Sequence, residues 1–340
     1  MTTYIIRRML WSIPVLLALL LAVFLLMHAI PGGPFDFAGD KSLPASTVRN
    51  LERLYGLDKP LPEQFVKYIS AIVLHGDLGP SFRQRGRTVN QIVGESLPIS
   101  AQLGVMAIGL ALLIGVPAGI IAALNHNRLP DYTASFLAIL GVSVPALAMG
   151  PLLYWLFALK LGRLPVSLWS AERPFFLGFI PIPTAKFLKH AVLPVLALGT
   201  GLSASIARLT RASLLQVVRE DYIRTARAKG LRERLVVVRH ALKNSLIPVV
   251  TVLGPMFAAV VTGTVVIEAI FGIPGMGKYF VQGINNRDYP LIMGVTLVYA
   301  VLLVLANLFV DITPTPGSTR ESGSPRRPSE RSLDRWLCRN

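Results

Sequence analysis

Residues 220–254 read EDYIRTARAKGLRERLVVVRHALKNSLIPVVTVLG, a dense basic segment that runs into a long apolar one. A short helix is expected near its start, with Asp221 as the N-cap residue. The residues at 222–229 favour helix, and Gly230 is placed to end that helix in the left-handed conformation. Such a helix is about 12 Å long, at about 1.5 Å per residue. A second helical run follows, and Pro248 marks the turn into the apolar segment.

The side chains of this short helix suit close contact with another surface. Ala226 and Ala228 have almost no side chain, whereas Arg224, Arg227 and Lys229 place positive charge around the helix. A basic amphipathic helix of this kind suits either anionic lipid headgroups or a protein partner. Charge and periodicity alone leave both interpretations open.

The composition is that of a polytopic membrane protein. The chain has 340 residues, of which 53% are hydrophobic and 15% charged, and its mean hydropathy is +0.56. The net charge of +16 is carried by Lys and Arg between long apolar runs, which fits orientation in a bilayer better than nucleic-acid binding. The single cysteine, Cys338, excludes an internal disulfide and a cysteine metal cluster.

Six apolar segments are long enough to cross the hydrocarbon core, which predicts an all-α membrane protein with six transmembrane helices. They are 9–30, 99–124, 134–159, 190–207, 246–270 and 289–311. A cleaved signal peptide is the alternative for the first segment, but its apolar core is longer than that of most signals. No small-x-small cleavage site follows it. Six spans place both termini on the same side of the membrane.

These segments divide the chain into four parts. Residues 1–30 form the N-terminal start and the first helix. Residues 31–98, of mixed charge with Gly and Pro at intervals, form an insert outside the membrane. Residues 99–311 form the core with five further helices. Residues 312–340 are rich in Pro, Ser and Arg, and they are expected to be a disordered tail.

Loop charge predicts the orientation of the spans. The connector at 208–245 carries ten Lys and Arg against three acids, which makes it the most basic loop and predicts a cytoplasmic location. Both termini are then cytoplasmic, and the insert at 31–98 is extracytoplasmic. The segment at 160–189 is an exception, because it is also net positive and falls outside.

The sequence shows no pattern of an enzyme site. It has no Walker-type glycine loop, its five histidines lack metal-ligand spacing, and no serine lies in a nucleophile elbow. No catalytic, cofactor or metal residue is therefore expected. His28 and Glu268 lie near the outer ends of their spans, where we expect them to contact water rather than to relay protons. The energy for transport is then expected to come from outside this chain.

Four stretches resemble the permeases of ABC importers, in the form typical of the dipeptide, oligopeptide and nickel group. They are YIIRRMLWSIPVLL at 4–17, GDLGPSFRQRGRTVNQIVGESLPIS at 76–100, DYIRTARAKGLRERLVVVRHALKNSLIPVVTVLG at 221–254 and EAIFGIPGMGKYFVQGINNRDYPLIMG at 268–294. The general Glu-Ala-Ala signature of these permeases is replaced here by Arg224, Thr225 and Ala226 before Gly230, a variation that the peptide group resembles. The tail is a second departure, because members of the group usually end soon after the last span.

The resemblance implies a type I ABC-importer permease fold in a bacterial or archaeal cell membrane. The chain would form half of a pathway for di- or oligopeptides and pair with a second, homologous permease chain. ABC ATPase subunits would bind ATP and dock from the cytoplasm, and a solute-binding protein would deliver substrate from outside. The ATPase-coupling residues that it implies are Asp221, Tyr222, Arg224, Thr225, Ala226, Arg227, Ala228, Lys229 and Gly230.

Two alternative functions remain open at this point. The first is an importer permease of the same architecture for nickel or another small solute. The second is a membrane scaffold without a solute pathway, whose basic loop binds lipid or a cytoplasmic partner. Copurification with ATP-hydrolysing subunits distinguishes a transporter from such a scaffold.

Overall fold

The computed structural model describes residues 2–35, 44–84, 86–165, 169 and 184–312. Within these ranges the regular secondary structure is helical, and one isolated antiparallel bridge joins Pro80 and Thr88. The expectation of an all-α membrane protein is confirmed. The tail predicted at 312–340 lies outside the described residues, except for Ile312 at the end of the last helix.

Four helices are long and apolar enough to cross a membrane by themselves. They are α1 (Thr2–Ala29), α4 (Val89–Leu124), α7 (Ala185–Val217) and α14 (Tyr289–Ile312). Two further spans are bent pairs, so the described residues contain up to six spans, the number predicted. The first pair consists of α5 (Leu129–Ser143) followed by α6 (Ala146–Leu153) and the π-helix η1 (Tyr154–Lys160). The second pair runs through α9 (Glu233–Leu235), η2 (Val236–Ala241), α10 (Leu242–Ser245) and α11 (Ile247–Gly263).

Proline sits at both bends. The first pair bends by 95°, where Pro145 stands as the N-cap of α6 after an extended Val144. The second pair bends by 41°, with Pro248 in the first turn of α11. Because proline offers no backbone N–H and crowds the preceding turn, it interrupts a helix at these points without ending the span.

Helix α4 begins earlier than the apolar run predicts. The sequence suggested a start at Ile99, after Pro98, but the helix already begins at Val89. Thr88 caps it, since the Thr88 hydroxyl accepts from the backbone N–H of Gln91 and the Gln91 side chain bonds back in a capping box. A helix of 36 residues is about 54 Å long, against about 30 Å of hydrocarbon. One end of α4 therefore extends beyond the membrane.

The centre of the bundle is the packing of α4 against α7, which the glycines of α4 make possible. A Cβ atom on Gly115 would lie 2.6 Å from the carbonyl oxygen of Ser203. One on Gly119 would lie 2.6 Å from the carbonyl oxygen of Ala207. The two backbones are thus in direct contact, as small residues allow between membrane helices.

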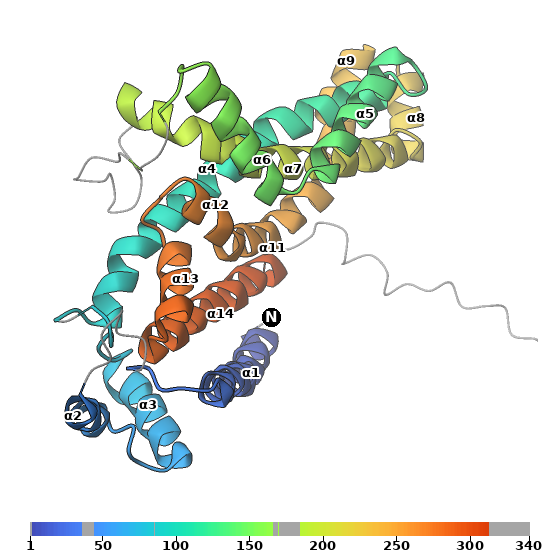
Figure 1. The fold of residues 1–340 in the computed structure, drawn as a ribbon. Helices are drawn as coiled ribbons and strands as arrows, with labels where there is room; N and C mark the ends of the chain where they lie inside the picture. The colour runs from blue at the N-terminus through green and yellow to red at the C-terminus, as the bar shows by residue number, and fades with distance from the viewer. Residues whose placement is uncertain (1, 36–43, 85, 166–168, 170–183, 313–340) are drawn as a thin grey trace, which may run out of the picture.

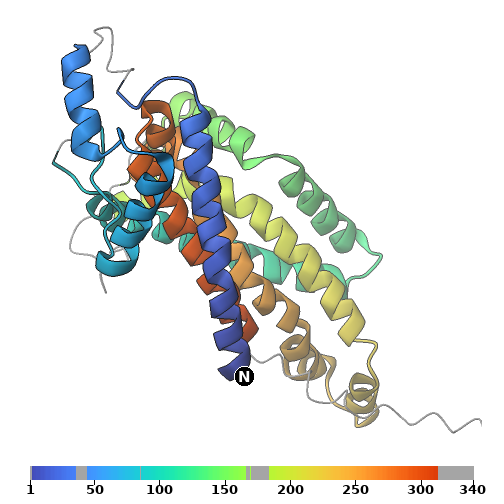
Figure 2. The same cartoon turned by 90° about the horizontal axis from the view of Figure 1, so that it is seen from below.

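The remaining helices lie at the two ends and in the middle of this bundle (Figure 1). They are α2 (Ala45–Tyr55) and α3 (Leu61–His75) in the insert, α8 (Asp221–Ala228) in the basic loop, and α12 (Val265–Ile270) and α13 (Met276–Asn286) before α14. The insert helices and α8 lie at opposite ends of the molecule in Figures 1 and 2. An event at α8 must therefore be transmitted along the spans to reach the insert.

Candidate coupling site

Helix α8 forms where the sequence predicts it, with one difference at its start. Glu220 is the N-cap residue, and its side chain makes no capping hydrogen bond. Asp221 is instead the first helical residue, where its negative charge favours the helix N-terminus. Its carboxylate pairs with Arg224 of the next turn, Oδ1 to Nη1 at 3.3 Å, and both side chains are exposed. The expected N-cap role of Asp221 is therefore wrong by one position.

The end of α8 confirms the role predicted for Gly230. Gly230 has φ of +73° and donates its N–H to the carbonyl of Arg227 at 2.9 Å. Lys229 is the C-cap residue before it. A Cβ on Gly230 would meet nothing within 4 Å, so the need for glycine is conformational and not one of space.

One face of α8 is packed against its own chain. Ile223 is fully buried and Ala226 is 6% exposed. They form a cluster with Leu214 of α7 and Ala123 at the end of α4. The role expected for Ala226 therefore changes, because its small side chain lets α8 seat on the permease itself. Ile223 is not among the predicted site residues. Its spacing of three residues from Ala226, with charged residues at the positions around them, is nevertheless the pattern of a buried helix face.

The other face of α8 is open to solvent. The exposed predicted residues are Asp221, Tyr222, Arg224, Thr225, Arg227, Ala228, Lys229 and Gly230. Of these, Ala228 is the one small side chain on the helix that leaves room for a second surface to approach. Six of these residues lie on α8, which has eight positions, and Lys229 and Gly230 follow its last residue.

Two contacts hold this edge to the helical run that follows. Arg227 bonds both carboxylate oxygens of Glu233, Nη2 to Oε1 at 2.7 Å and Nε to Oε2 at 3.1 Å. The hydroxyl of Tyr222 accepts from the Asn244 side chain at 2.9 Å. Arg227 and Arg224 thus each have an acidic partner in their own chain, and both the Asp221–Arg224 pair and Lys229 are exposed.

An ion pair next to α8 joins two spans, and it was not predicted. Asp131, in the first turn of α5, is 2% exposed. Arg211 of α7 bonds it twice, Nε to Oδ1 at 2.6 Å and Nη2 to Oδ2 at 2.7 Å. The backbone N–H of Asn127 donates to Oδ2 at 2.9 Å, and His126 Nδ1 lies 3.3 Å from the same oxygen. Bidentate pairs of this kind fix orientation as well as distance.

This ion pair lies close to the cluster that seats α8. Arg211 and Leu214 are three residues apart on α7 and thus neighbours on the helix surface. Leu214 shares a buried cluster with Ile223 and Ala226 of α8, and Arg211 bonds Asp131 of α5. The two contacts thus lie within one turn of each other on α7. Asp131 stands three residues before the apolar segment predicted at 134–159, so the apolar pattern does not indicate its burial, and a buried acid needs a partner.

Glu268 is buried and does not contact water, contrary to the prediction. It is 0% exposed. Its Oε1 accepts from the hydroxyls of Ser100, at 2.6 Å, and Thr264, at 2.8 Å. Its Oε2 accepts from the backbone N–H groups of Gly277, at 2.8 Å, and Lys278, at 3.3 Å. The carboxylate thus joins α4, α12 and the N-terminus of α13. The first backbone N–H groups of a helix have no partner within the helix, so they can donate to a carboxylate.

His28, the second residue expected to contact water, is half-buried. Its Nδ1 donates to the carbonyl oxygen of Phe24 at 2.8 Å, and its ring lies 5.1 Å from that of Tyr289. Among the described residues, no group of three or more His, Cys, Asp or Glu side chains could hold a metal ion.

Comparison with family models places the chain among known sequences. Residues 115–313 match the model described as "Binding-protein-dependent transport system inner membrane component". Residues 1–104 match the model of the N-terminal region of the corresponding membrane component. The two matches include the insert and all spans except residues 105–114 within α4.

Curated relatives match along nearly the whole length. The chain is 42% identical over 312 residues to the oligopeptide transport system permease protein OppB of Escherichia coli K12, covering 92% of this chain and 96% of that protein. It is also 42% identical over 312 residues to the dipeptide transport system permease protein DppB of Bacillus subtilis 168, covering 92% and 95%. The glutathione transport system permease protein GsiC of Pectobacterium atrosepticum is 38% identical, covering 92% and 96%.

Solved structures share the fold. The methionine ABC transporter MetNI in an inward-facing conformation gives a TM-score of 0.52 at 15% identity, covering 65% of this chain and 94% of that one. An amino acid ABC transporter solved with histidines gives 0.50 at 16% identity, covering 65% and 92%. At this identity the likeness concerns the arrangement of helices alone.

Proposed function

Since the chain belongs to the family of binding-protein-dependent transport system inner membrane components, we propose that it is the permease subunit of an ATP-driven importer of oligopeptides or dipeptides. The observation that carries the proposal is 42% identity to both OppB and DppB over 92% of the chain. The chain is a multi-pass protein of a bacterial inner membrane and is not itself an enzyme. Partner ATPase subunits bind the ATP, and a binding protein supplies the solute.

The finer assembly is part of the proposal. This chain pairs with a second, homologous permease chain, so that each supplies half of the pathway within the membrane lipid. The basic connector at 208–245 is cytoplasmic, which puts both termini in the cytoplasm and the insert at 31–98 outside. The excess of ten Lys and Arg over three acids in that connector supports this orientation.

Helix α8 is the element that contacts the ATPase in this proposal. Its exposed edge is short, polar and basic, and Ala228 lets a partner approach closely. Arg224 and Lys229 then face the partner, where charges affect orientation and association rate more than affinity. Gly230 and the Arg227–Glu233 contact fix the angle between α8 and the helices after it.

Movement of α8 reaches the spans through packed contacts. Ile223 and Ala226 pack in one buried cluster with Leu214 of α7. Arg211, three residues before Leu214, donates two hydrogen bonds to Asp131 of α5. When the ATPases close on nucleotide, α8, α7 and α5 therefore move as one body. Displacement of rigid elements against each other is a common way in which such transitions are carried.

Reconstitution tests this function directly. The chain is coexpressed with the second permease, the ATPases and the binding protein encoded with it, and the purified complex is placed in proteoliposomes. We expect uptake of a labelled tripeptide that requires ATP and the binding protein. Uptake of nickel ions without uptake of peptide would favour the alternative importer. A chain that purifies without ATPase subunits and binds only anionic liposomes would overturn the proposal in favour of the scaffold.

A further inference from the structure

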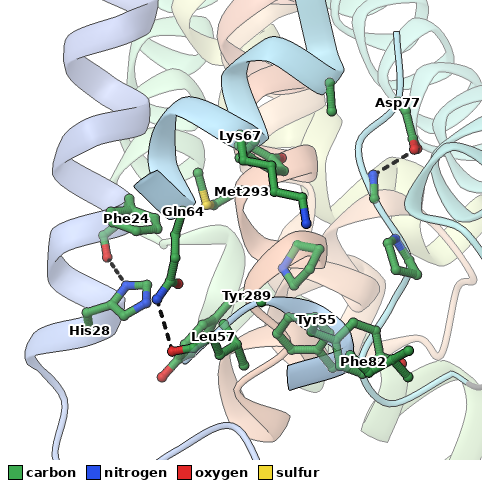
Figure 3. Close-up of a pocket in the computed structure, with 17 residues that line it drawn as sticks. Phe24, His28, Tyr55, Leu57, Gln64, Lys67, Asp77, Phe82, Tyr289 and Met293 are labelled. Carbon is green, nitrogen blue, oxygen red and sulfur yellow. Dashed lines mark hydrogen bonds between the residues drawn. The ribbon is translucent and has the colours of Figure 1, made fainter. Parts of the chain in front are cut away.

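A cavity of about 260 Å³ lies at the insert end of the molecule, far from α8. It is bounded by the end of α1, by α3, by the start of α14, and by the turn that follows α2 (Figure 3). The segment from Asp77 to Phe82 closes a further side. Because it opens where two spans end, the cavity is located at the membrane boundary.

Aromatic rings form one continuous wall of this cavity. The rings of Phe24 and His28 lie 4.2 Å apart, and His28 lies 5.1 Å from Tyr289. Tyr289 is 6.2 Å from Phe82, which is 4.6 Å from Tyr55. Such rings provide a rigid apolar surface and are typical of the depth at which a bilayer meets water. The wall therefore suits the apolar part of a ligand.

Two donors are available on the α3 side. The ammonium of Lys67 points into the space between the rings in Figure 3, and it lies 3.5 Å from where a Cβ on Gly56 would be. No ion pair or hydrogen bond of the Lys67 ammonium occurs among the described residues. The hydroxyl of Tyr68 is buried and has no partner in the same part of the chain. Burial raises the pKa of Tyr68, so the hydroxyl stays protonated and can donate. A buried hydroxyl without a partner requires an explanation, and a bound ligand provides one.

A carboxylate is available elsewhere on the wall. Asp77 Oδ1 accepts from the backbone N–H of Gly79 at 2.9 Å, which orients the side chain and leaves Oδ2 without a partner among the described residues. The other polar groups are used in building the wall. Gln64 Nε2 donates to the carbonyl oxygens of Leu57 and Lys59, at 3.1 and 2.7 Å. The groups left for a ligand are thus the Lys67 ammonium, the Tyr68 hydroxyl and the Asp77 carboxylate, and the carboxylate acts electrostatically on the hydroxyl.

We propose that this cavity binds a zwitterion, with its anionic oxygen group on Lys67 and Tyr68, its primary ammonium on Asp77, and its apolar part against Phe82 and Tyr289. Two sources supply this chemistry at the membrane boundary. One is the headgroup of an aminophospholipid, whose phosphate and ammonium are joined by a short linker. The other is a free peptide. The peptide source rests on the proposed function and the orientation of the insert, whereas the lipid source rests on the cavity alone.

The carboxylate of Asp77 is what separates this proposal from a general site for anions. An acidic lipid without an amine would bring a second negative charge toward Asp77, and like charges at short range repel. A choline headgroup carries its charge without an N–H and cannot donate to Oδ2. We therefore expect the cavity to prefer ligands that carry a primary ammonium as well as a phosphate or carboxylate.

The test uses the complete transporter complex, purified in detergent and analysed by native mass spectrometry. In the lipid arm, dioleoyl phosphatidylethanolamine, phosphatidylcholine and phosphatidylglycerol are titrated separately. In the peptide arm, the dipeptide Ala-Phe is titrated against its N-acetylated and C-amidated form in the absence of the binding protein. Each arm is repeated with three variants: Lys67→Met, Tyr68→Phe and Asp77→Asn. ATP hydrolysis and peptide uptake are measured in parallel, so that loss of the site and loss of the transport function are told apart.

Two matched controls accompany these variants. Lys59→Met removes another ammonium of the insert, one that pairs with Glu63 and does not line the cavity. Tyr132→Phe removes a hydroxyl from an exposed tyrosine of α5. We expect Tyr68→Phe to weaken binding about threefold to tenfold, the effect of one hydrogen bond, and Lys67→Met to weaken it about tenfold or more. Both controls should bind as the native chain does.

The outcomes separate the sources. Preferential binding of phosphatidylethanolamine that Lys67→Met and Asp77→Asn both reduce assigns the cavity to a lipid headgroup. Binding of Ala-Phe with the same dependence, lost on blocking both ends, assigns it to a peptide. Equal binding of phosphatidylglycerol and phosphatidylethanolamine, or no change in either arm with Tyr68→Phe and Lys67→Met in folded complexes, overturns the proposal.

Discussion

Arg211 holds Asp131 through two hydrogen bonds, Nε to Oδ1 at 2.6 Å and Nη2 to Oδ2 at 2.7 Å, although the two residues are 80 positions apart. The pair fastens the first turn of α5 to α7, close to Leu214, where α7 also seats α8. If α8 meets the ATPase, we expect this pair to contribute to the transmission of its movement to α5.

Replacing Arg211 by Met should damage the protein more than replacing Asp131 by Asn. Without Arg211, the carboxylate of Asp131 stays 2% exposed without its main partner, and removal of one member of a buried pair costs about 3–5 kcal/mol. Asp131→Asn leaves Arg211, whose side chain is 29% exposed and can reach water. Differential scanning fluorimetry of the complex should show the larger fall in melting temperature for Arg211→Met.

The same variants should separate ATP hydrolysis from uptake. In Asp131→Asn complexes we expect ATPase activity close to native and peptide uptake reduced about tenfold, because the charged bidentate pair that helps to hold α5 against α7 is lost. Arg208→Met, an exposed arginine one turn away, is the control. Uptake by Asp131→Asn equal to that of Arg208→Met would contradict the role given to the pair.

The turn after α8 gives a second prediction. Gly230→Val should impair coupling, since φ of +73° is a conformation that β-branched residues rarely adopt. The strain is of the order of 1–3 kcal/mol. A Cβ there meets no atom within 4 Å, so the effect is one of backbone conformation alone.

Gly230→Asn is the matched variant, because asparagine tolerates the left-handed region. We expect Gly230→Asn to keep most of the uptake per ATP hydrolysed in proteoliposomes and Gly230→Val to lose most of it. Equal uptake per ATP in the two variants would show that the turn has no part in coupling.

Much of the fold could be predicted because the signals are local. An apolar run such as that of α14 predicts a span by length, and the left-handed stop at Gly230 follows from its position after a helix-forming segment. The start of α4 was also readable, since Thr88 and Gln91 have capping-box spacing. The apolar run begins after Pro98 and so predicts a later start, whereas membrane helices tolerate internal proline.

The parts that could not be predicted depend on partners far apart in the sequence. The burial of Glu268 follows from Ser100, which is 168 positions away, and from the unpaired N–H groups at the start of α13. The angle of 95° at Pro145 likewise depends on how α6 packs against its neighbours. The sequence shows where a charge or a proline stands. It does not show which residues from distant parts of the chain pack against it.

The close contact of α4 and α7 gives a third prediction. Gly119→Ala should destabilise the bundle, because its Cβ would lie 2.6 Å from the carbonyl oxygen of Ala207 and 2.6 Å from Thr210 Cβ. Overpacking of this kind typically costs about 1–3 kcal/mol. Gly109→Ala on the same helix is the control, since its Cβ meets nothing within 4 Å. Equal melting temperatures for the two variants would contradict direct backbone contact.

The hydrogen bonds of Glu268 give the last prediction. It compares the loss of these buried hydrogen bonds with the loss of a carboxylate charge at the surface. In Glu268→Gln the amide keeps one acceptor oxygen and turns its NH₂ toward donors, which leaves either the two hydroxyls or the N–H groups of Gly277 and Lys278 without an acceptor. Each buried donor left unpaired costs about 1–3 kcal/mol. Glu95→Gln, which removes a surface pair with Arg87, should change stability much less. Hydrogen exchange at the start of α13 checks the mechanism: faster exchange in Glu268→Gln than in Glu95→Gln is expected, and equal protection would show that the carboxylate does not hold α13.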